Sequence, residues 1–458
     1  MAFALRFTAL ALASTLCVAA QAAHPSAALV DASLQNPAAH FVPGQLIVQF
    51  RAGVQEQGAA AALSTIGARP ARLVLAESRR HDGLGDLRLV SLPENLTVRE
   101  AMQQLREHPS VEFAEPNWIY TRQDKGPDPY YADGRLWGMY GADSPLQQNI
   151  YGSGAGTAFA DGKRCKGSIV VGVIDEGVMT THPDTMANIW TNPYEIAGNG
   201  KDDDGNGFVD DVHGWDFFDN DASTFDGIGD DHGTHVSGTI GAVGNNAVGV
   251  AGVCTKIQMV NAKFLGPNGG STADAVRAMD YITDLKTRHD MNIVATNNSW
   301  GGGGFSQSLK SAIDRAGDAE ILVIAAAGND GTDNDQIPHY PSSYPNDNII
   351  AVAAIGSGGL KASFSNYGLT SVDLGGPGVA INSTVPVQSG GDIVGGYASY
   401  SGTSMATPHV TGAVALYASL HPGTSAAKIK KAILSHTIPT DSLAGKTVTG
   451  GRLDVSKY

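Results

Sequence analysis

Three residues that together could perform nucleophilic catalysis stand far apart in this chain of 458 residues. Asp175 ends a continuous β-branched run, His232 lies in Asp-His-Gly-Thr-His, and Ser404 lies in Gly-Thr-Ser, ahead of an apolar segment. A serine nucleophile needs a neutral imidazole as its base and a carboxylate that orients the imidazole. The order Asp, His, Ser is one of those in which such triads occur. Alone, Gly-Thr-Ser could be a helix N-cap, so the chemical interpretation depends on all three stretches.

The elements expected around these residues are those of an α/β protein. Apolar, β-branched runs are typical of strands buried in a parallel sheet. Because helical patterns alternate with these runs, we predict a doubly wound parallel sheet, whose functional residues gather at the carboxyl ends of strands. Ser404 would begin a helix, where unpaired N–H groups and the helix dipole favour a negative oxygen. The expected strands span residues 169–175, 257–264, 293–298, 321–327 and 349–355, and the expected helices include 272–289 and 306–318.

These motifs resemble those of the subtilisin-like serine proteases, or subtilases. The match rests on Asp-Glu-Gly after the first strand, on His-Gly-Thr-His-Val and on Gly-Thr-Ser-Met-Ala-Thr-Pro-His-Val, and it extends over residues 130–458. The resemblance implies that Asp175 orients the base, that His232 is the base and that Ser404 is the nucleophile. It also implies that Asn329, in Ala-Ala-Ala-Gly-Asn, donates its amide to the oxyanion.

Two histidines and one glutamate beside the motifs need a separate interpretation. The family's catalytic histidine is the first of the two in its motif, so His235 and His409 are expected to be packed helix residues. Glu176 departs from the family pattern, in which a small Thr or Ser is more common. We expect its charge to shift the pH optimum and to leave the triad intact.

The resemblance also implies a first specificity pocket. One wall would be the strand edge that pairs with the substrate backbone, the opposite wall would follow a buried strand, and a histidine would form the floor. Trp300 is a departure, because family members often carry a smaller apolar residue there. We expect a preference for apolar or aromatic side chains before the cleaved bond. The residues assigned to this pocket are Ser299, Trp300, Gly301, Ala326, Gly328 and His339.

The start of the chain indicates an export signal followed by a small separate domain. Residues 1–23 combine Arg6, an apolar run and an Ala-x-Ala site, which is typical of a cleaved secretory signal. Residues 24–40 are expected to be a flexible leader. Residues 41–121 show a β-α-β-β-α-β-like pattern, which predicts a ferredoxin-like α+β unit. No other stretch is apolar and long enough to cross a membrane.

The small unit has two interpretations. It could be an independent ligand-binding module. Beside a subtilase domain over residues 122–458, it resembles the family's inhibitory propeptide, which assists folding and places its last strand in the substrate cleft. We therefore expect intramolecular inhibition, followed by self-cleavage between about Ile119 and Asp128.

Negative charge is concentrated between residues 195 and 231, with one Glu and eleven Asp against one Lys in a chain of net charge −15. A solvated acidic loop would explain this run, but Asp-x-Asp-x-Asn-Gly spacing turns alternate oxygens toward one hard cation and favours Ca²⁺. The glutamate expected to close such a loop is missing, so Asp210 or Asp211 would close the shell instead. The predicted ligands are Asp202, Asp204, Asn206, Phe208 and Asp210.

A second calcium site follows from the resemblance alone. Asp184 in His-Pro-Asp and Asn246 in Gly-Asn-Asn-Ala-Val-Gly-Val match the family's structural calcium site. The carbonyls of Val248 and Val250 would complete it. Calcium is expected to have a structural role in both places.

The three cysteines suit an exported protein. Cys17 leaves with the signal, so Cys165 and Cys254 remain. Each precedes a predicted strand, near the amino ends of neighbouring strands, which predicts a disulfide between them. Two free buried thiols are the alternative. There is no Cys/His spacing typical of zinc, and the acidic balance argues against nucleic-acid binding.

Together these features predict a secreted, extracellular or periplasmic, calcium-stabilised serine endopeptidase made as a zymogen. We expect a monomer that acts on proteins or peptides, is inhibited by its own propeptide and has no membrane association after signal cleavage. A catalytically silent scaffold and another serine hydrolase, such as an esterase, are the other classes. Against an esterase, Gly402 to Ala406 lacks the second glycine of the Gly-x-Ser-x-Gly motif.

Overall fold

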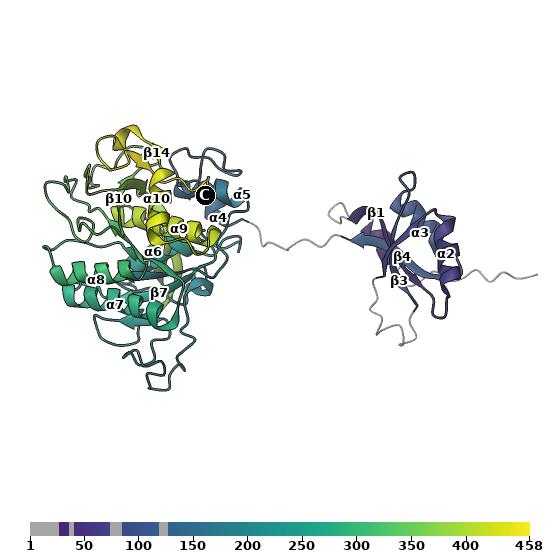
Figure 1. Cartoon of the computed structure of the whole chain (residues 1–458), viewed down its shortest axis with the longest axis horizontal. Coiled ribbons are helices and arrows are strands. Elements are labelled where there is room, and N and C mark those ends of the chain that lie inside the picture. Colours follow the sequence, from purple (N-terminus) through teal and green to yellow (C-terminus); the bar gives the residue numbers. More distant parts are fainter. Residues whose placement is uncertain (1–26, 36–40, 74–84, 119–126) are drawn as a thin grey trace, which may run out of the picture. The chain divides into compact units, whose positions relative to one another are not determined.

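The structure is a computed structural model that describes residues 27–35, 41–73, 85–118 and 127–458 (Figure 1). The expected signal peptide and most of the expected cleavage segment lie outside the described residues. The chain divides into two compact units, Met1–Gln123 and Asp124–Tyr458. Each unit is described by itself.

The small unit contains a four-stranded antiparallel sheet. Its strands are β1 (Phe41–Phe50), β2 (Arg69–Leu73), β3 (Leu87–Ser91) and β4 (Val111–Trp118). Their order is β2-β3-β1-β4. Helices α2 (Glu56–Thr65) and α3 (Val98–Arg106) share a buried core with β1. This is the ferredoxin-like arrangement that the sequence predicts, and β2 is the strand that the sequence did not single out.

The expectation of a flexible leader over residues 24–40 is wrong for its middle part. Helix α1 (Ala27–Ser33) forms there, and Val30 and Leu34 pack against the core of the small unit. Asp31 pairs with Arg106 at 2.9 Å. The apolar surface buried by these contacts offsets the entropy cost of ordering the segment.

The large unit is built on a nine-stranded sheet. Its strands, in chain order, are β5 (Val170–Asp175), β6 (Gly214–Asp216), β7 (Gln258–Lys263), β8 (Ile293–Asn298), β9 (Leu322–Ala326), β10 (Ile349–Ile355), β11 (Leu374–Pro377), β14 (Ile438–Pro439) and β15 (Gly451–Arg452). They are arranged as β14-β15-β11-β10-β9-β8-β5-β7-β6, and every pair except β14–β15 is parallel. All five strands expected from the sequence are present.

Helices cover both faces of this sheet (Figure 1). On one face, α7 (Thr272–His289) and α8 (Gln307–Asp318) enclose one apolar core, and on the other α6 (Asp231–Gly241) and α9 (Thr403–Leu420) enclose a second. A further helix, α10 (Ala426–Ser435), packs against α9. The doubly wound α/β arrangement is therefore confirmed, and the carboxyl ends of β5, β8 and β9 meet at one edge of the sheet.

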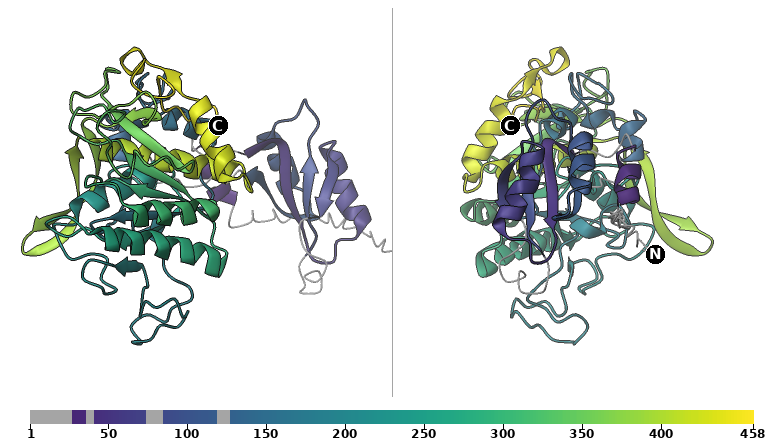
Figure 2. Two further views of the ribbon diagram at one scale, coloured as in Figure 1. Left: turned by 60° about the vertical axis from the view of Figure 1, so that its left-hand side comes forward. Right: turned by 90° about the vertical axis from the view of Figure 1, so that its right-hand side faces the viewer.

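Two features lie outside the sheet. Strands β12 (Ile381–Ser389) and β13 (Asp392–Tyr400) form an antiparallel hairpin that projects from the body of the large unit (Figure 2). The arm that precedes β5 contains α4 (Pro129–Ala132) and α5 (Ala155–Ala160). In this arm, Trp137 donates its indole N–H to the carbonyl of Val379 at 2.9 Å, so the arm packs on the large unit.

Cys165 and Cys254 form the predicted disulfide, with their Cα atoms 5.4 Å apart. They precede β5 and β7, which are hydrogen-bonded neighbours in the sheet. Over the described residues, no helix combines the length and apolar character that crossing a membrane requires.

Candidate active site and cation-binding loops

Asp175 and His232 form a hydrogen-bonded pair. Asp175 is the last residue of β5 and is 1% exposed, and His232 is the second residue of α6. Oδ1 of Asp175 lies 2.8 Å from Nδ1 of His232. The same oxygen accepts the main-chain N–H of Glu176 at 2.9 Å. A carboxylate on Nδ1 holds the ring and leaves Nε2 for proton transfer.

Three carboxylates act on the pKa of His232. Burial lowers this pKa, but Asp175, Glu176 and Asp231 raise it more, to about 9. Burial and the neighbouring Asp175 raise the pKa of Glu176 to about 7. A general base works only in its neutral form. His232 therefore becomes available as a base toward alkaline pH.

Ser404 is the second residue of α9, which begins directly after Gly402. Its hydroxyl donates to the carbonyl of Ser299 at 3.0 Å, and the Ser299 hydroxyl donates to the carbonyl of Ser404 at 2.8 Å. Among the contacts of the described residues, none joins Ser404 to His232. Catalytic hydrogen bonds are often loose without substrate, and rotation about χ1 redirects this hydroxyl.

Asn329 follows β9 and is tied to the start of α9. Its Oδ1 accepts the main-chain N–H of Thr403 at 2.9 Å and the Thr403 hydroxyl at 3.0 Å. A Cβ built on Gly402 would lie 3.6 Å from Nδ2 of Asn329 and 3.5 Å from the main-chain N of Ser404. Two donors thus border the space beside Gly402, which suits a developing oxyanion. The sequence did not single out Thr403, although it lies within the Gly-Thr-Ser motif.

Two of the residues assigned to the specificity pocket, Gly301 and Gly328, lie against His339. Ser299, Trp300 and Gly301 follow β8, whereas Ala326 and Gly328 lie at and beyond the end of β9. A Cβ on Gly301 would lie 2.1 Å from Cε1 of His339, and one on Gly328 would lie 2.9 Å from its Cδ2. The imidazole therefore lies against both glycine backbones.

Trp300 and His339 have different surroundings within this group. The Trp300 ring packs edge-on against Phe264, with ring centroids 4.8 Å apart, and contacts the core beneath α7 and α8. Burial lowers the pKa of His339. An imidazole that is neutral at pH 7 suits an uncharged pocket.

His235 and His409 are packed helix residues, as the sequence suggests. His235 is buried, stacks on Tyr400 with centroids 4.6 Å apart and lies 2.9 Å from the carbonyl of Ile381 through Nε2. Nδ1 of His409 lies 2.9 Å from the carbonyl of Met405. Burial lowers the pKa of His235 to about 3 and that of His409 to about 4. Both rings are therefore neutral in the range where His232 titrates.

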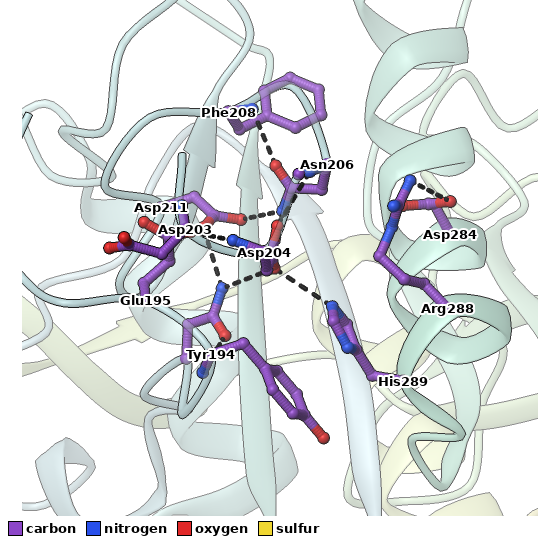
Figure 3. Close-up of polar contacts among 12 residues, drawn as sticks. Tyr194, Glu195, Asp203, Asp204, Asn206, Phe208, Asp211, Asp284, Arg288 and His289 are labelled. Carbon is purple, nitrogen blue, oxygen red and sulfur yellow. Dashed lines mark hydrogen bonds and ion pairs between the residues drawn. The ribbon is translucent and has the colours of Figure 1, made fainter. Parts of the chain in front are cut away.

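The acidic loop gathers oxygen atoms as its spacing predicts (Figure 3). Carboxylate oxygens of Glu195, Asp202 and Asp204 all lie within 4.8 Å of one another. Nδ2 of Asn206 donates to Asp204 at 3.2 Å, and the main-chain N–H of Phe208 donates to Oδ1 of Asn206 at 2.7 Å. Glu195 was not among the predicted ligands, because it lies outside the Asp-x-Asp-x-Asn motif.

Asp210 and Asp211, the two residues expected to close the shell, have different hydrogen-bond partners. The carboxylate of Asp210 accepts the main-chain N–H groups of Asn199 and Gly200, at 3.1 and 2.8 Å, and so caps a turn. Asp211 is fully buried and accepts Nδ2 of Asn206 at 2.9 Å, Nδ2 of Asn192 at 2.9 Å and the Tyr281 hydroxyl at 2.6 Å. Asp210 has a positive φ of 57°.

The second predicted site surrounds Asp184, which is fully buried. Its carboxylate accepts Nδ2 of Asn246 at 2.7 Å and the main-chain N–H of Val250 at 2.8 Å. The structure adds Asp128, 3% exposed, whose carboxylate accepts the main-chain N–H of Asn246 at 3.1 Å. The main-chain N–H of Val248 donates to Oδ1 of Asn246 at 2.8 Å, which closes the loop beside Asp184.

These buried carboxylates fit a cation. Among the described residues, no Lys or Arg pairs with Asp128, Asp184 or Asp211. Burial raises the pKa of all three, to about 6 for Asp184 and Asp211. Buried carboxylate charge is costly when hydrogen bonds alone compensate it, and oxygen-rich loops are the surroundings that Ca²⁺ prefers.

Comparison with known proteins agrees with this geometry. A model of the subtilase family matches residues 166–452, and a model of the fervidolysin N-terminal prodomain matches residues 27–117. A thermophilic serine proteinase from Bacillus sp. (strain AK1) is 33% identical over 395 residues, which are 86% of this chain and 82% of that protein. Thermitase from Thermoactinomyces vulgaris is 34% identical over 331 residues, which are 72% of this chain and 97% of thermitase.

A solved structure extends the likeness to the fold. A protease from Pseudoalteromonas arctica PAMC 21717 shares 27% sequence identity, with a TM-score of 0.57 over 72% of this chain and 98% of that one. The family match covers more than half of the chain and includes Asp175, His232, Asn329 and Ser404. The chain therefore belongs to the subtilase family: it is a serine protease, a hydrolase of peptide bonds, with a fervidolysin-like prodomain.

Proposed function

We propose that this protein is a secreted serine endopeptidase made as a zymogen, with Asp175, His232 and Ser404 as its catalytic triad. The observation that carries the proposal is the 2.8 Å contact between Asp175 and Nδ1 of His232. The position of Ser404 in the first turn of α9, beside two candidate oxyanion donors, supports it.

The reaction follows from these positions. Ser404 turns from the Ser299 carbonyl, attacks the scissile carbonyl and gives its proton to Nε2 of His232, while Asp175 stabilises the imidazolium. Nδ2 of Asn329 and the main-chain N–H of Ser404 bind the oxyanion. His232 then protonates the leaving amine, and water repeats the cycle on the acyl-enzyme.

The specificity pocket would lie between the segments 299–301 and 326–328. Gly301 and Gly328 lie against His339, whose neutral ring offers an apolar face with one polar edge. This supports a preference for apolar or aromatic side chains before the cleaved bond. Proteins and peptides are the proposed substrates, and a monomer is the proposed active form.

The prodomain would inhibit the protease until it is cleaved. We assign residues 1–23 to the signal, 24–40 to the leader, 41–121 to the propeptide and 122–458 to the protease domain. The prodomain match ends at residue 117, and β4 ends at Trp118. Cleavage between about Ile119 and Asp128 would separate the two compact units.

Calcium would stabilise the mature protease at two places. Asp184, Asn246, Asp128 and the carbonyls of Val248 and Val250 would hold one ion. Asp202, Asp204, Asn206, the carbonyl of Phe208 and Glu195 would supply ligands for the other, with Asp210 or Asp211 closing its shell. A bound cation compensates the buried negative charge and gives the acidic loop a fixed shape. No catalytic step needs it.

Export is supported by two observations. The N-terminal segment has the pattern of a secretory signal, and Cys165 and Cys254 form a disulfide, which persists in oxidising compartments. An extracellular protease of Xanthomonas campestris pv. campestris is 33% identical over 406 residues. We place the mature protein outside the cell or in the periplasm.

One experiment tests triad, zymogen and peptide specificity together. Residues 24–458 are expressed with calcium beside a Ser404→Ala copy, and intact mass is followed over time. We expect the parent to shorten to a product that starts between about Ile119 and Asp128, and the copy to stay whole. A folded parent that stays whole and cleaves no protein after its propeptide is removed would refute the proposal and favour a silent scaffold. Hydrolysis of lipid-like esters alone would favour an esterase.

A further inference from the structure

Glu176 holds the helix that carries His232. Its Oε1 accepts the main-chain N–H of His232 at 2.5 Å, although the two residues are 56 positions apart. The first N–H groups of a helix have no partner within it. The N-cap of α6, Asp230, makes no side-chain cap hydrogen bond. Glu176 therefore supplies an acceptor that the helix start otherwise lacks.

Two consecutive residues at the end of β5 therefore hydrogen-bond to His232 at two different atoms. Asp175 contacts ring Nδ1 and Glu176 contacts the main-chain N–H. A single contact on the ring would leave the backbone free to shift, whereas two contacts from consecutive residues fix the imidazole in position and direction. Hydrogen bonds to an ionised carboxylate are also stronger than neutral ones.

We propose that Glu176 is a positioning residue for His232: it anchors the backbone of the catalytic histidine, and its negative charge favours the imidazolium. The inference rests on the proposed role of His232 as the base. It concerns an interaction that a Thr or Ser at this position could not make in the same way, because their side chains are shorter and uncharged.

The other charges around His232 define what Glu176 adds. Asp175 at the end of β5 and Asp231 on α6 also raise the pKa of His232, and His235 on α6 lies close enough to interact with it. From β13, the Tyr400 hydroxyl donates to Asp231.

One cation lies nearby but is engaged elsewhere. Lys263, at the end of β7, pairs with Asp230 at 2.6 Å and with Asp226 at 2.8 Å. It therefore does not neutralise Glu176. The charge of Glu176 can be removed while the Asp175–His232 contact is kept.

Two substitutions separate anchoring from charge. Glu176→Gln keeps an acceptor oxygen and the side-chain volume but removes the charge. Glu176→Ala removes both. The matched control is Glu320, which likewise accepts the N–H at a helix start, that of Ala426 on α10, at 2.6 Å. Glu320→Gln and Glu320→Ala measure the effect on kcat and on the His232 pKa of losing a comparable hydrogen bond at a helix start far from His232 in the chain.

The first readout does not need turnover. In the full chain carrying Ser404→Ala, NMR follows the titration of the His232 ring. We expect Glu176→Gln to lower the pKa of His232 by about one unit, the size expected for loss of one close charge. Glu320→Gln should leave it unchanged. An unchanged titration in Glu176→Gln would overturn the electrostatic part. The titration is measured in the inactive Ser404→Ala chain, so its result does not depend on turnover. Failure of the proposed function would appear separately, as a lack of protease activity in the chain that retains Ser404.

The second readout is the pH dependence of kcat and KM for the mature protease on a peptide substrate. We expect Glu176→Gln to move the acid limb of kcat to lower pH by about one unit and to keep kcat on the plateau within about threefold. Glu176→Ala should lower plateau kcat by about tenfold or more with little change in KM, because His232 is misplaced. Plateau kcat in Glu176→Ala equal to that of Glu320→Ala would overturn the positioning role.

Discussion

The side-chain carbonyl of Asn329 accepts two hydrogen bonds from Thr403, one from its main-chain N–H at 2.9 Å and one from its hydroxyl at 3.0 Å. An amide held through its oxygen has its NH₂ group fixed in direction. That group lies beside the space at Gly402, next to the main-chain N of Ser404. The loop after β9 and the start of α9 therefore form one rigid donor pair.

This relationship predicts graded losses of activity. Asn329→Ala removes a donor to the oxyanion, so kcat should fall by about 10²–10³ with KM nearly unchanged. Thr403→Val keeps the shape and the main-chain bond but removes the hydroxyl, which donates to Asn329 and also accepts the main-chain N–H of Gly328 at 3.2 Å, so the loss should be about two- to tenfold. Steady-state kinetics on a peptide substrate measure both. Equal losses in the two variants would contradict the assignment of Asn329 as the donor and of Thr403 as the residue that orients it.

Removal of calcium should destabilise the protein. At a free concentration one hundred times Kd, a bound ion adds about 2.7 kcal/mol per site to the free energy of unfolding. We expect chelation to lower Tm and to expose residues 195–211 to proteolysis, measured on the Ser404→Ala chain to avoid self-digestion.

Two variants and a control assign this effect to the proposed sites. Asp184→Asn and Asp204→Asn should each reduce the difference in Tm between calcium and chelator. Asp284→Asn should not, because the Asp284 side chain is 41% exposed on α7 and pairs with Arg288, away from the loop carboxylates (Figure 3). A Tm independent of calcium in the parent would refute both sites.

Two buried histidines should make the protein acid-sensitive. Burial lowers the pKa of His409 to about 4 and that of His235 to about 3, against 6.5 when unfolded. The unfolded chain therefore binds more protons as pH falls below 6.5, and the free energy of unfolding decreases by about 1.4 kcal/mol per pH unit for each histidine.

His409→Gln tests the assignment, because glutamine does not titrate. Between pH 6.5 and pH 4, the slope of the free energy of unfolding against pH should correspond to one proton fewer in the variant than in the parent. The slope is measured by denaturant titration of the Ser404→Ala chain with saturating calcium. His421→Gln, at an exposed position just beyond α9, is the control for replacing a histidine at the protein surface. The assignment fails if both variants keep the parent slope.

The disulfide should slow unfolding. It closes a loop of 89 residues between Cys165 and Cys254, and removal of a native disulfide of this span costs about 2–5 kcal/mol. The double variant Cys165→Ala/Cys254→Ala leaves no free thiol in the mature part of the chain. Its half-life in denaturant should be shorter than that of the parent. An unchanged half-life would show that the disulfide does not slow unfolding of the protein.

Sequence patterns determined the elements of this protein and the residue types of its site. Strands β8 and β10 and helix α7 have the bounds that their apolar patterns predict, because each pattern has the period of its element and is buried accordingly. Asp175 is placed at the carboxyl end of a strand by local sequence alone. The disulfide was predictable because its cysteines precede neighbouring strands.

Contacts between distant segments were decided only by the tertiary structure. No local pattern predicts the pairing of Glu176 with the N–H of His232, of Asn329 with Thr403, or of Asp128 with the loop around Asn246, because each pairing joins elements far apart in the chain. The spacing of apolar residues along the chain determines where each helix or strand forms. Which other elements it contacts is determined by the packing of the whole sheet.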